Sequence, residues 1–289
     1  MGISILERVR WSPLSLREPM RIITSLPTGR HPGYTLGHRS FLADRFIISA
    51  AADRRIAKLG ILQLQRETKA MSFTADQIYA GQAVYTRPIL RIYDFAVLGL
   101  SNQLIWKCPT ERLREHYDKH VTANHLDVGV GTGYFLDKCR FPVQAPRVAL
   151  MDLNETSLDF ASRRIARYQP EIYVRNVLAP IAIDAPKFDS VGINYLLHCL
   201  PGAIESKAVA LDHLKALMNP GAVLFGSTLL QGGVQRSRFA KHLMDIYNKK
   251  GIMSNAHDSL DGLKTALHQR FREVSVEVVG CVALFSGRF

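Results

Sequence analysis

His125-Leu126-Asp127-Val128-Gly129-Val130-Gly131-Thr132-Gly133 is the stretch that decides the fold of this chain. It combines a short apolar strand, an acid near the strand's end and three glycines at alternate positions. Glycine is required where the backbone must turn tightly and approach a ligand without a Cβ in the way. A helix is expected directly after the loop, and the first N–H groups of a helix are free to bind polar or anionic atoms. The stretch therefore predicts a nucleotide-type binding loop.

Beyond this loop, apolar segments of strand length alternate with segments of helical period. We expect strands at residues 147–153, 171–177, 188–196 and 222–229, and helices at residues 134–141, 157–168 and 204–218. This alternation is typical of an α/β fold with a parallel sheet covered by helices on both faces. Ligands of such sheets bind at the carboxyl ends of the strands, where the strand order reverses.

The two ends of this unit depart from plain alternation. After helices expected at residues 235–250 and 260–271, the strands at 274–280 and 282–288 follow each other so closely that they must pair antiparallel. Before the first strand, residues 71–120 read as short helices that form a lid over the ligand site, ahead of a core of residues 121–289. Tyr85 and Tyr93 in this lid are candidates for the substrate pocket, and either also fits an ordinary core position.

Residues 1–70 differ from the rest of the chain in charge. They hold 12 Lys and Arg against 5 Asp and Glu, so +7 of the formal charge of +12 falls there and +5 on the other residues. No regular period persists over residues 1–45. We expect a poorly ordered extension or a start-site artefact, and a targeting segment or a binding arm are the alternatives.

Composition argues against several kinds of site. The four cysteines (Cys108, Cys139, Cys199 and Cys281) stand far apart, which disfavours a disulfide framework and fits a reducing compartment. No apolar run reaches the length of a membrane span, no clustered basic patch follows residue 70, and no His-rich metal motif occurs. We therefore expect a cytoplasmic protein with no metal, no membrane span and no nucleic-acid partner.

Two carboxylates narrow the choice of nucleotide. Asp127 precedes the first glycine by two residues, and Asp152 ends the second expected strand. A carboxylate at the second position also serves nicotinamide cofactors, but dinucleotide loops prefer G-x-G-x-x-G, and Tyr134 stands where the last glycine belongs. An acid ahead of G-x-G-x-G suits a ligand with an ammonium group and no pyrophosphate, which describes S-adenosylmethionine.

The glycine motif, the pair Asp152-Leu153 and the terminal hairpin together resemble the class I S-adenosylmethionine-dependent methyltransferases over about residues 75–289. The resemblance implies a three-layer, Rossmann-like, seven-stranded sheet and methyl transfer to oxygen, nitrogen or carbon of a small molecule of secondary metabolism. It further implies that Asp127 and the loop hold the amino-acid end of the cofactor, Asp152 the ribose and Leu153 the adenine. The expected cofactor residues are Asp127, Gly129, Gly131, Gly133, Asp152, Leu153, Asn176, Val177 and Asn194.

One of these positions departs from the family pattern. Asn176 stands where the family often has an Asp that accepts a hydrogen bond from the adenine amino group. An amide oxygen also accepts hydrogen bonds, so we expect the contact to be kept.

The segment from Asn194 to Gly202 lies where the family has a substrate-facing loop. His198 is the candidate general base, because its pKa lies near neutrality, and a structural His under the loop is the alternative. Tyr195 and Arg236 are candidate substrate-pocket residues, although Arg236 also suits a solvated helix start. Asn194-Tyr195 differs from the Asn-Pro-Pro-Tyr motif used on nucleic-acid bases. An NAD(P)-dependent oxidoreductase and a non-catalytic binding module on the same fold stay open as alternative functions.

Overall fold

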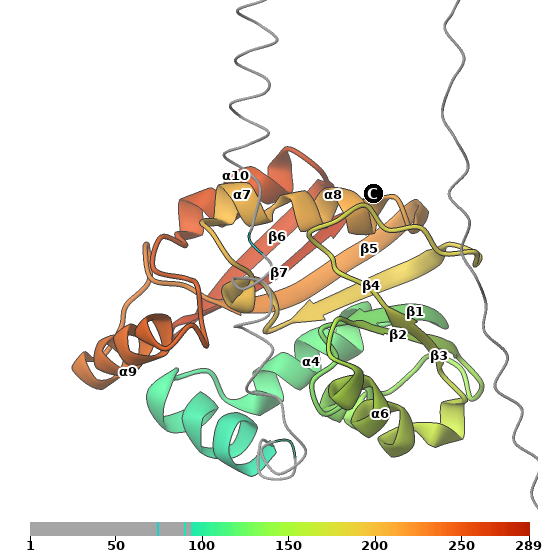
Figure 1. Ribbon diagram of the computed structural model, residues 1–289, viewed down its shortest axis with the longest axis horizontal. Helices are drawn as coiled ribbons and strands as arrows, with labels where there is room; N and C mark the ends of the chain where they lie inside the picture. The colour runs from blue at the N-terminus through green and yellow to red at the C-terminus, as the bar shows by residue number, and fades with distance from the viewer. Residues whose placement is uncertain (1–73, 75–89, 91–93) are drawn as a thin grey trace, which may run out of the picture. The chain divides into compact units, whose positions relative to one another are not determined.

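The computed structural model describes residues 74, 90 and 94–289, shown as the coloured ribbon in Figure 1. The extension of residues 1–70, most of the expected lid and the candidate pocket residues Tyr85 and Tyr93 lie outside the described residues. What the sequence predicts for them stays a prediction.

A seven-stranded sheet with the order β3-β2-β1-β4-β5-β7-β6 forms the centre of the described part (Figure 1). Its strands are β1 Asn124–Val128, β2 Arg147–Asp152, β3 Glu171–Val174, β4 Phe188–Asn194, β5 Met218–Leu229, β6 Arg272–Val279 and β7 Val282–Arg288. Strands β1 to β5 run parallel, and β7 pairs antiparallel with both β5 and β6. The predicted fold class, including the closing hairpin, is confirmed.

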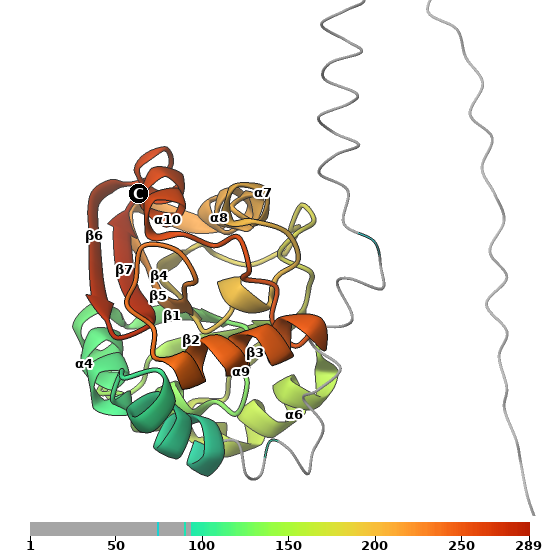
Figure 2. The same ribbon diagram turned by 90° about the vertical axis from the view of Figure 1, so that its left-hand side faces the viewer.

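Helices cover both faces of the sheet, giving three layers (Figure 2). One face carries α4 Thr110–His120, α5 Tyr134–Lys138 and α6 Glu155–Arg164, and the other carries α7 Ile204–Lys207, α8 Val209–Lys215 and α10 Leu260–His268. A π-helix, η1 (Asp94–Ile105), and α9 (Arg238–Lys249) pack with β7 in a third cluster. Two short 3-10 turns, η2 (Ala166–Tyr168) and η3 (Leu197–Cys199), complete the elements.

Local sequence signals set the starts of three helices. The side chains of Asn154, Ser237 and Ser259 accept hydrogen bonds from the backbone N–H three residues on, at the starts of α6, α9 and α10. Replacing such a cap by Ala costs typically about 1 kcal/mol.

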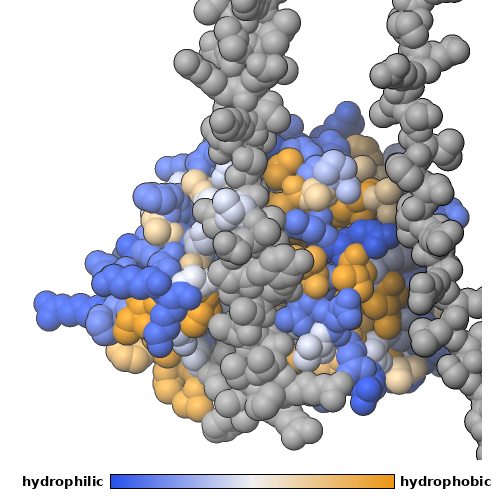
Figure 3. Space-filling model, viewed as in Figure 1, coloured by the Kyte–Doolittle hydropathy of each residue, from blue (hydrophilic) through white to orange (hydrophobic). Residues whose placement is uncertain are grey.

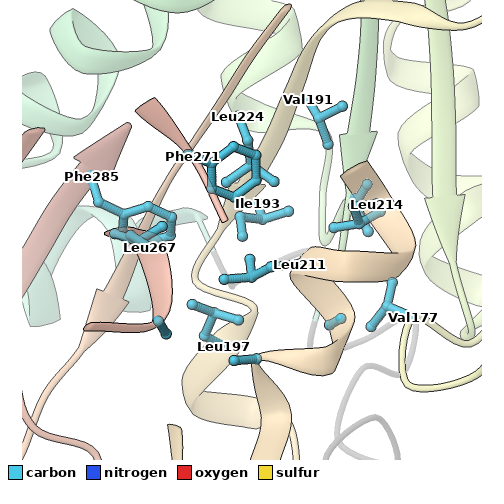
Figure 4. Close-up of a cluster of buried hydrophobic side chains, with 14 of the residues drawn as sticks. Val177, Val191, Ile193, Leu197, Leu211, Leu214, Leu224, Leu267, Phe271 and Phe285 are labelled. Atoms are coloured by element: carbon cyan, nitrogen blue, oxygen red, sulfur yellow. The ribbon is translucent and has the colours of Figure 1, made fainter. Parts of the chain in front are cut away.

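The largest core cluster lies between the sheet and α7, α8 and α10. Figure 4 shows Leu211 and Leu214 of α8 close to Val191 and Ile193 of β4, and all four side chains are buried. Burying a side chain of this size contributes about 1.5–3 kcal/mol. This apolar layer holds the carboxyl end of β4 in place.

Several element ends differ from the expected ones. Among the short helices expected within residues 71–120, η1 is a single π-helix from Asp94 to Ile105. The helix expected at residues 204–218 is divided into α7 and α8 and ends by Lys215, because Met218 already pairs with Phe188 in the sheet. Strand β3 ends at Val174, three residues early, because the Asn176 side chain closes a turn by accepting from the Leu178 N–H.

Helix η1 is buried on one side and exposed on the other, and apolar residues lie on both sides. Leu98 and Trp106, at its inner side and its end, are 4% and 2% exposed, whereas Leu100 and Leu104 are 44% and 58% exposed. Figure 3 shows hydrophobic residues at the surface over η1 and α9. Among the described helices, none has the length and apolar character needed to cross a membrane.

Candidate active site

A cleft lies at the carboxyl ends of β1, β2 and β4, the edge where the strand order reverses between β1 and β4. It holds about 1100 Å³ of empty space, part of it open to solvent. Eight of the nine sequence-predicted cofactor residues line it, namely Asp127, Gly129, Gly131, Asp152, Leu153, Asn176, Val177 and Asn194.

The three glycines of the loop have different tasks. All have positive φ, between 51° and 72°, a region that favours glycine. A Cβ on Gly129 would lie 2.9 Å from Leu196 Cδ1, whereas a Cβ on Gly131 would meet no atom within 4 Å. Gly131 is therefore the place where the loop leaves open space for a ligand.

Gly133 is the predicted cofactor residue that the structure does not place in the cleft lining. It caps the start of α5, and a Cβ there would lie 3.1 Å from the Ala161 Cβ on α6. Its position serves the close packing of α5 against α6.

The two carboxylates stand at the ends of neighbouring strands. Asp127 Oδ1 accepts a hydrogen bond of 3.0 Å from the Tyr117 hydroxyl, and Asp127 is only 7% exposed. Asp152 Oδ1 accepts from the Asn154 N–H at 2.9 Å. Burial raises the pKa of Asp152 to about 6, although backbone hydrogen bonds act in the opposite direction.

The amide residues around the cleft are held by their own neighbours. Asn194 Oδ1 accepts from the Ser227 hydroxyl at 3.0 Å, and its buried Nδ2 has no partner among the described residues. Asn176 Oδ1 already accepts from the Leu178 N–H at 2.9 Å. Its oxygen is thus shared with a turn before any ligand arrives.

These groups suit the cofactor that the sequence resemblance implies. Asp127 and Asp152 offer carboxylates for an ammonium group and for ribose hydroxyls, and Leu153 and Val177 offer apolar surface for a flat ring. The open space at Gly131 and the unpartnered Asn194 Nδ2 leave room and a donor for the same ligand. S-adenosylmethionine therefore fits this set of residues.

Helix η1 is fastened to the glycine loop by a contact that the sequence pattern did not reveal. Asp94 Oδ1 accepts from the Thr132 hydroxyl at 2.6 Å, and Asp94 Oδ2 pairs with Arg164 Nη1 at 2.5 Å. Arg164 also pairs with Asp137 at 3.2 Å. We call the contact of Asp94 with Thr132 and Arg164 the Asp94 clasp.

Tyr195, a candidate for the substrate pocket, lines the cleft, but its hydroxyl faces η1. It donates to Asn102 Oδ1 at 2.8 Å, and Asn102 is fully buried. The Tyr195 φ of 56° is rare for a residue with a bulky side chain. Such strain, typical of functional sites, is kept here by the surrounding contacts.

His198 and Arg236 are not among the residues that line the cleft, although the His198 ring packs edge-on against Tyr195, which is one of them. His198 is 4% exposed, and its Nδ1 accepts from the Leu229 N–H at 3.3 Å. Burial lowers its pKa to about 3, and Lys207 acts in the same direction. Arg236 donates to Gln231 Oε1. Within the part of the chain that the structure describes, no cluster of His, Cys, Asp and Glu is arranged to hold a metal.

Comparison with known proteins gives one consistent family. A model of the methyltransferase domain matches residues 126–224. Demethylluteothin O-methyltransferase from Streptomyces thioluteus is 42% identical over 209 residues, which cover 72% of this chain and 91% of that protein. A physcion biosynthesis cluster O-methyltransferase from Aspergillus chevalieri is 37% identical, over 71% of this chain and 93% of that protein. The solved DhpI–SAH complex has a TM-score of 0.52 at 17% identity, covering 75% and 98% of the two chains, and supports the fold alone.

Proposed function

The chain belongs to the S-adenosylmethionine-dependent methyltransferases of small molecules, and from this premise we propose that it methylates a hydroxyl oxygen of a largely apolar metabolite. When bound, the cofactor supplies an electrophilic methyl group, and the protein contributes binding, orientation and electrostatics. The oxidoreductase and the non-catalytic module, the two alternatives from the sequence, are set aside because the relatives are methyltransferases.

The uneven lining of the cleft carries this proposal. Carboxylates and glycines lie at the ends of β1 and β2, whereas the part formed by η1 and the loop after β4 is mainly apolar, with Leu98, Leu196, Leu200 and Pro201. A polar end suits the cofactor, and an apolar end suits a poorly hydrated acceptor. Identity of 42% to a protein named as an O-methyltransferase supports oxygen as the acceptor atom.

Within this proposal the residues of the cleft bind and orient the two ligands. Asp127 binds the amino-acid end of the cofactor, Asp152 accepts from the ribose and Leu153 packs on the adenine. Alignment of the acceptor in the apolar part supplies the orientation that displacement requires, which contributes up to about 7–11 kcal/mol in favourable systems. His198 is given a structural role, because its Nδ1 is already engaged by the Leu229 N–H.

The proposal also covers partners and place of action. The acceptor is a free small molecule rather than nucleic acid, and the enzyme acts in the cytoplasm. The lack of a clustered basic patch in the composition of residues 71–289 supports the first point, and the four cysteines far apart in the sequence, which fit a reducing compartment, support the second.

The test is methyl transfer from labelled S-adenosylmethionine to a panel of phenols, enols, amines and nucleic acid, read by mass spectrometry of the products. We expect hydroxyl acceptors to gain one methyl group and the demethylated cofactor to form in equal amount. Asp152→Asn should lose turnover at low cofactor concentration, whereas Asp189→Asn, at the opposite end of β4, should not. Transfer to amines or nucleic acid with none to hydroxyls would overturn the proposal.

A further inference from the structure

Strand geometry brings three polar residues and one glycine to one face of the sheet beneath the glycine loop. His125 and Asp127 are two residues apart on β1, so both side chains point to the same face. Their parallel partners on β4 are Ser190 and Gly192. Helix α4 covers this face, and its residue Tyr117 belongs to the core cluster there.

These residues form a continuous chain of hydrogen bonds that ends at the cleft. The Tyr117 hydroxyl lies 3.0 Å from Asp127 Oδ1 and 2.8 Å from His125 Nε2. His125 Nδ1 lies 2.8 Å from the Ser190 hydroxyl, which also accepts from the Thr122 N–H at 3.0 Å. Because Tyr117 donates to the carboxylate, His125 Nε2 donates to the Tyr117 oxygen, and the Nδ1 of a neutral imidazole then accepts from the Ser190 hydroxyl.

Water can reach this hydrogen-bond chain only near its two ends, at Asp127 in the cleft and at the partly exposed Thr122. Tyr117, His125 and Ser190 are 0% exposed, and Asp127 is 7% exposed and lines the cleft. Burial and the neighbouring Asp127 raise the pKa of Tyr117 well above its usual value, so its hydroxyl stays a donor.

Glycine at position 192 leaves the space that the hydrogen-bonded side chains occupy. A Cβ there would lie 3.1 Å from Asp127 Oδ1 and 3.2 Å from His125 Cε1. These hydrogen bonds use only Oδ1 of the Asp127 carboxylate, and Asp127 Oδ2 takes no part in them. Tyr117 thus holds Oδ1 on the side of α4, while the Asp127 carboxylate forms part of the cleft wall.

We propose that Tyr117 is a positioning residue for the cofactor, because its hydroxyl, held by His125 and Ser190, fixes the Asp127 carboxylate in the orientation that receives the cofactor's amino-acid end. This inference rests on the role proposed above for Asp127. It assigns function to a buried helix residue that contacts neither cofactor nor acceptor. Tyr117 acts only through Asp127.

The test compares two ligands by calorimetry with the full chain. S-adenosylhomocysteine has the amino-acid end, whereas 5′-methylthioadenosine lacks it and keeps the nucleoside. Tyr117→Phe preserves the ring, which packs on Phe135 and Phe225. We expect this variant to bind S-adenosylhomocysteine about tenfold or more weakly, as for the loss of a hydrogen bond to a charged group, and to bind methylthioadenosine with unchanged affinity. In the Asp127→Ala background, Tyr117→Phe should have no further effect on S-adenosylhomocysteine.

A matched control is Tyr173→Phe, which removes a hydroxyl that donates to another carboxylate, Glu171, at 2.6 Å on the edge strand β3. It should leave both affinities unchanged. If Tyr117→Phe does not fold, Ser190→Ala removes the hydrogen bond to His125 in the same series. It should weaken S-adenosylhomocysteine binding to a smaller extent and leave methylthioadenosine binding unchanged.

The outcomes separate the two proposals. Equal weakening of both ligands, or unchanged binding of S-adenosylhomocysteine, would overturn the role of Tyr117 while the enzyme assignment stands. Failure of the unaltered protein to bind S-adenosylhomocysteine at all would instead overturn the cofactor site itself.

Discussion

Lys207 and Asp258 form an ion pair inside the protein: Nζ lies 2.9 Å from Oδ2, and both side chains are fully buried. Lys207 also donates to the Ser254 carbonyl at 2.7 Å, so the pair ties α7 to the segment before α10. Asp258 Oδ1 has no partner among the described residues. Burial opposes both charges, because it raises the pKa of Asp258 to about 6 and lowers the pKa of Lys207, whereas the pairing itself acts in the opposite direction on each.

Breaking this pair should be more harmful than replacing it. We expect Lys207→Met to lower the free energy of unfolding by about 3–5 kcal/mol, because an unpaired carboxyl group is left buried. The double variant Lys207→Met/Asp258→Leu should recover most of that loss. Urea denaturation of the two variants and the parent protein provides the measurement. A double variant as unstable as the single one would contradict the argument.

His198 should make the protein sensitive to acid. Its folded pKa of about 3 lies below the ordinary value of 6.5, so between these values the unfolded chain binds a proton that the folded chain does not. Stability from this group is therefore complete above pH 6.5 and is lost as the pH falls toward 3. His198→Asn should remove this loss, so its stability relative to the parent should improve steadily on acidification. A constant difference between the two unfolding curves would rule this out.

The same variant tests the general-base assignment. Because the ring lies outside the cleft lining, we expect the pH profile of kcat for His198→Asn to keep the shape found in the parent protein. Loss of the acidic limb of that profile, where protonation of a general base lowers kcat, would restore His198 as the proton acceptor.

Asp152 should make cofactor binding depend on pH. Its raised pKa of about 6 means that the carboxylate is largely protonated at pH 5 and ionised at pH 7. Since the ionised form accepts two ribose hydroxyls and the protonated form has one acceptor fewer, S-adenosylhomocysteine should bind more tightly as the pH rises through 6. Calorimetry at both pH values measures this, and Asp152→Asn should give nearly the same affinity at each.

The Asp94 clasp should control how fast the cofactor product leaves. Asp94→Asn keeps the shape of the side chain but removes the charge that faces Arg164. We expect the dissociation rate of S-adenosylhomocysteine to rise by about three- to tenfold, the effect of losing one charged hydrogen bond of modest strength. Stopped-flow fluorescence gives the rate, with Asp212→Asn, which faces Arg270, as the control. An unchanged rate would show that the clasp does not restrain the ligand.

Two glycines of the loop should respond differently to the same substitution. Gly133→Ala adds a Cβ 3.1 Å from Ala161 at a φ of 70° and should lower stability by about 1–2 kcal/mol. Gly131→Ala meets no atom within 4 Å of the new Cβ, so beyond a similar backbone cost it should mainly weaken cofactor binding. Thermal unfolding without ligand measures the loss of stability. The additional stabilisation by S-adenosylhomocysteine measures the loss of cofactor binding.

The sequence alone was sufficient to predict features that depend on residues close together in the sequence, such as strands and the acids at their ends. The strands stand out as short apolar or alternating segments, and Asp127 and Asp152 lie at strand ends, so the cleft could be placed in advance. The Asp94 clasp and the Tyr117 hydrogen bond join residues from separate elements, and no spacing within one segment reveals them. The surroundings of His198 were also hidden, because its exposure depends on how β5 and the segment near Ser254 pack over it.

The place of β7 between β5 and β6 has a consequence for how the chain is made. The cofactor-binding strands β1 and β2 leave the ribosome early, but the sheet to which they belong has a gap until residues 282–288 are synthesised. Until then β5 presents an unpaired, largely apolar edge, which is prone to aggregation. A newly made chain is therefore most vulnerable just before its last strand is released, and cofactor bound to the early strands cannot by itself complete the sheet.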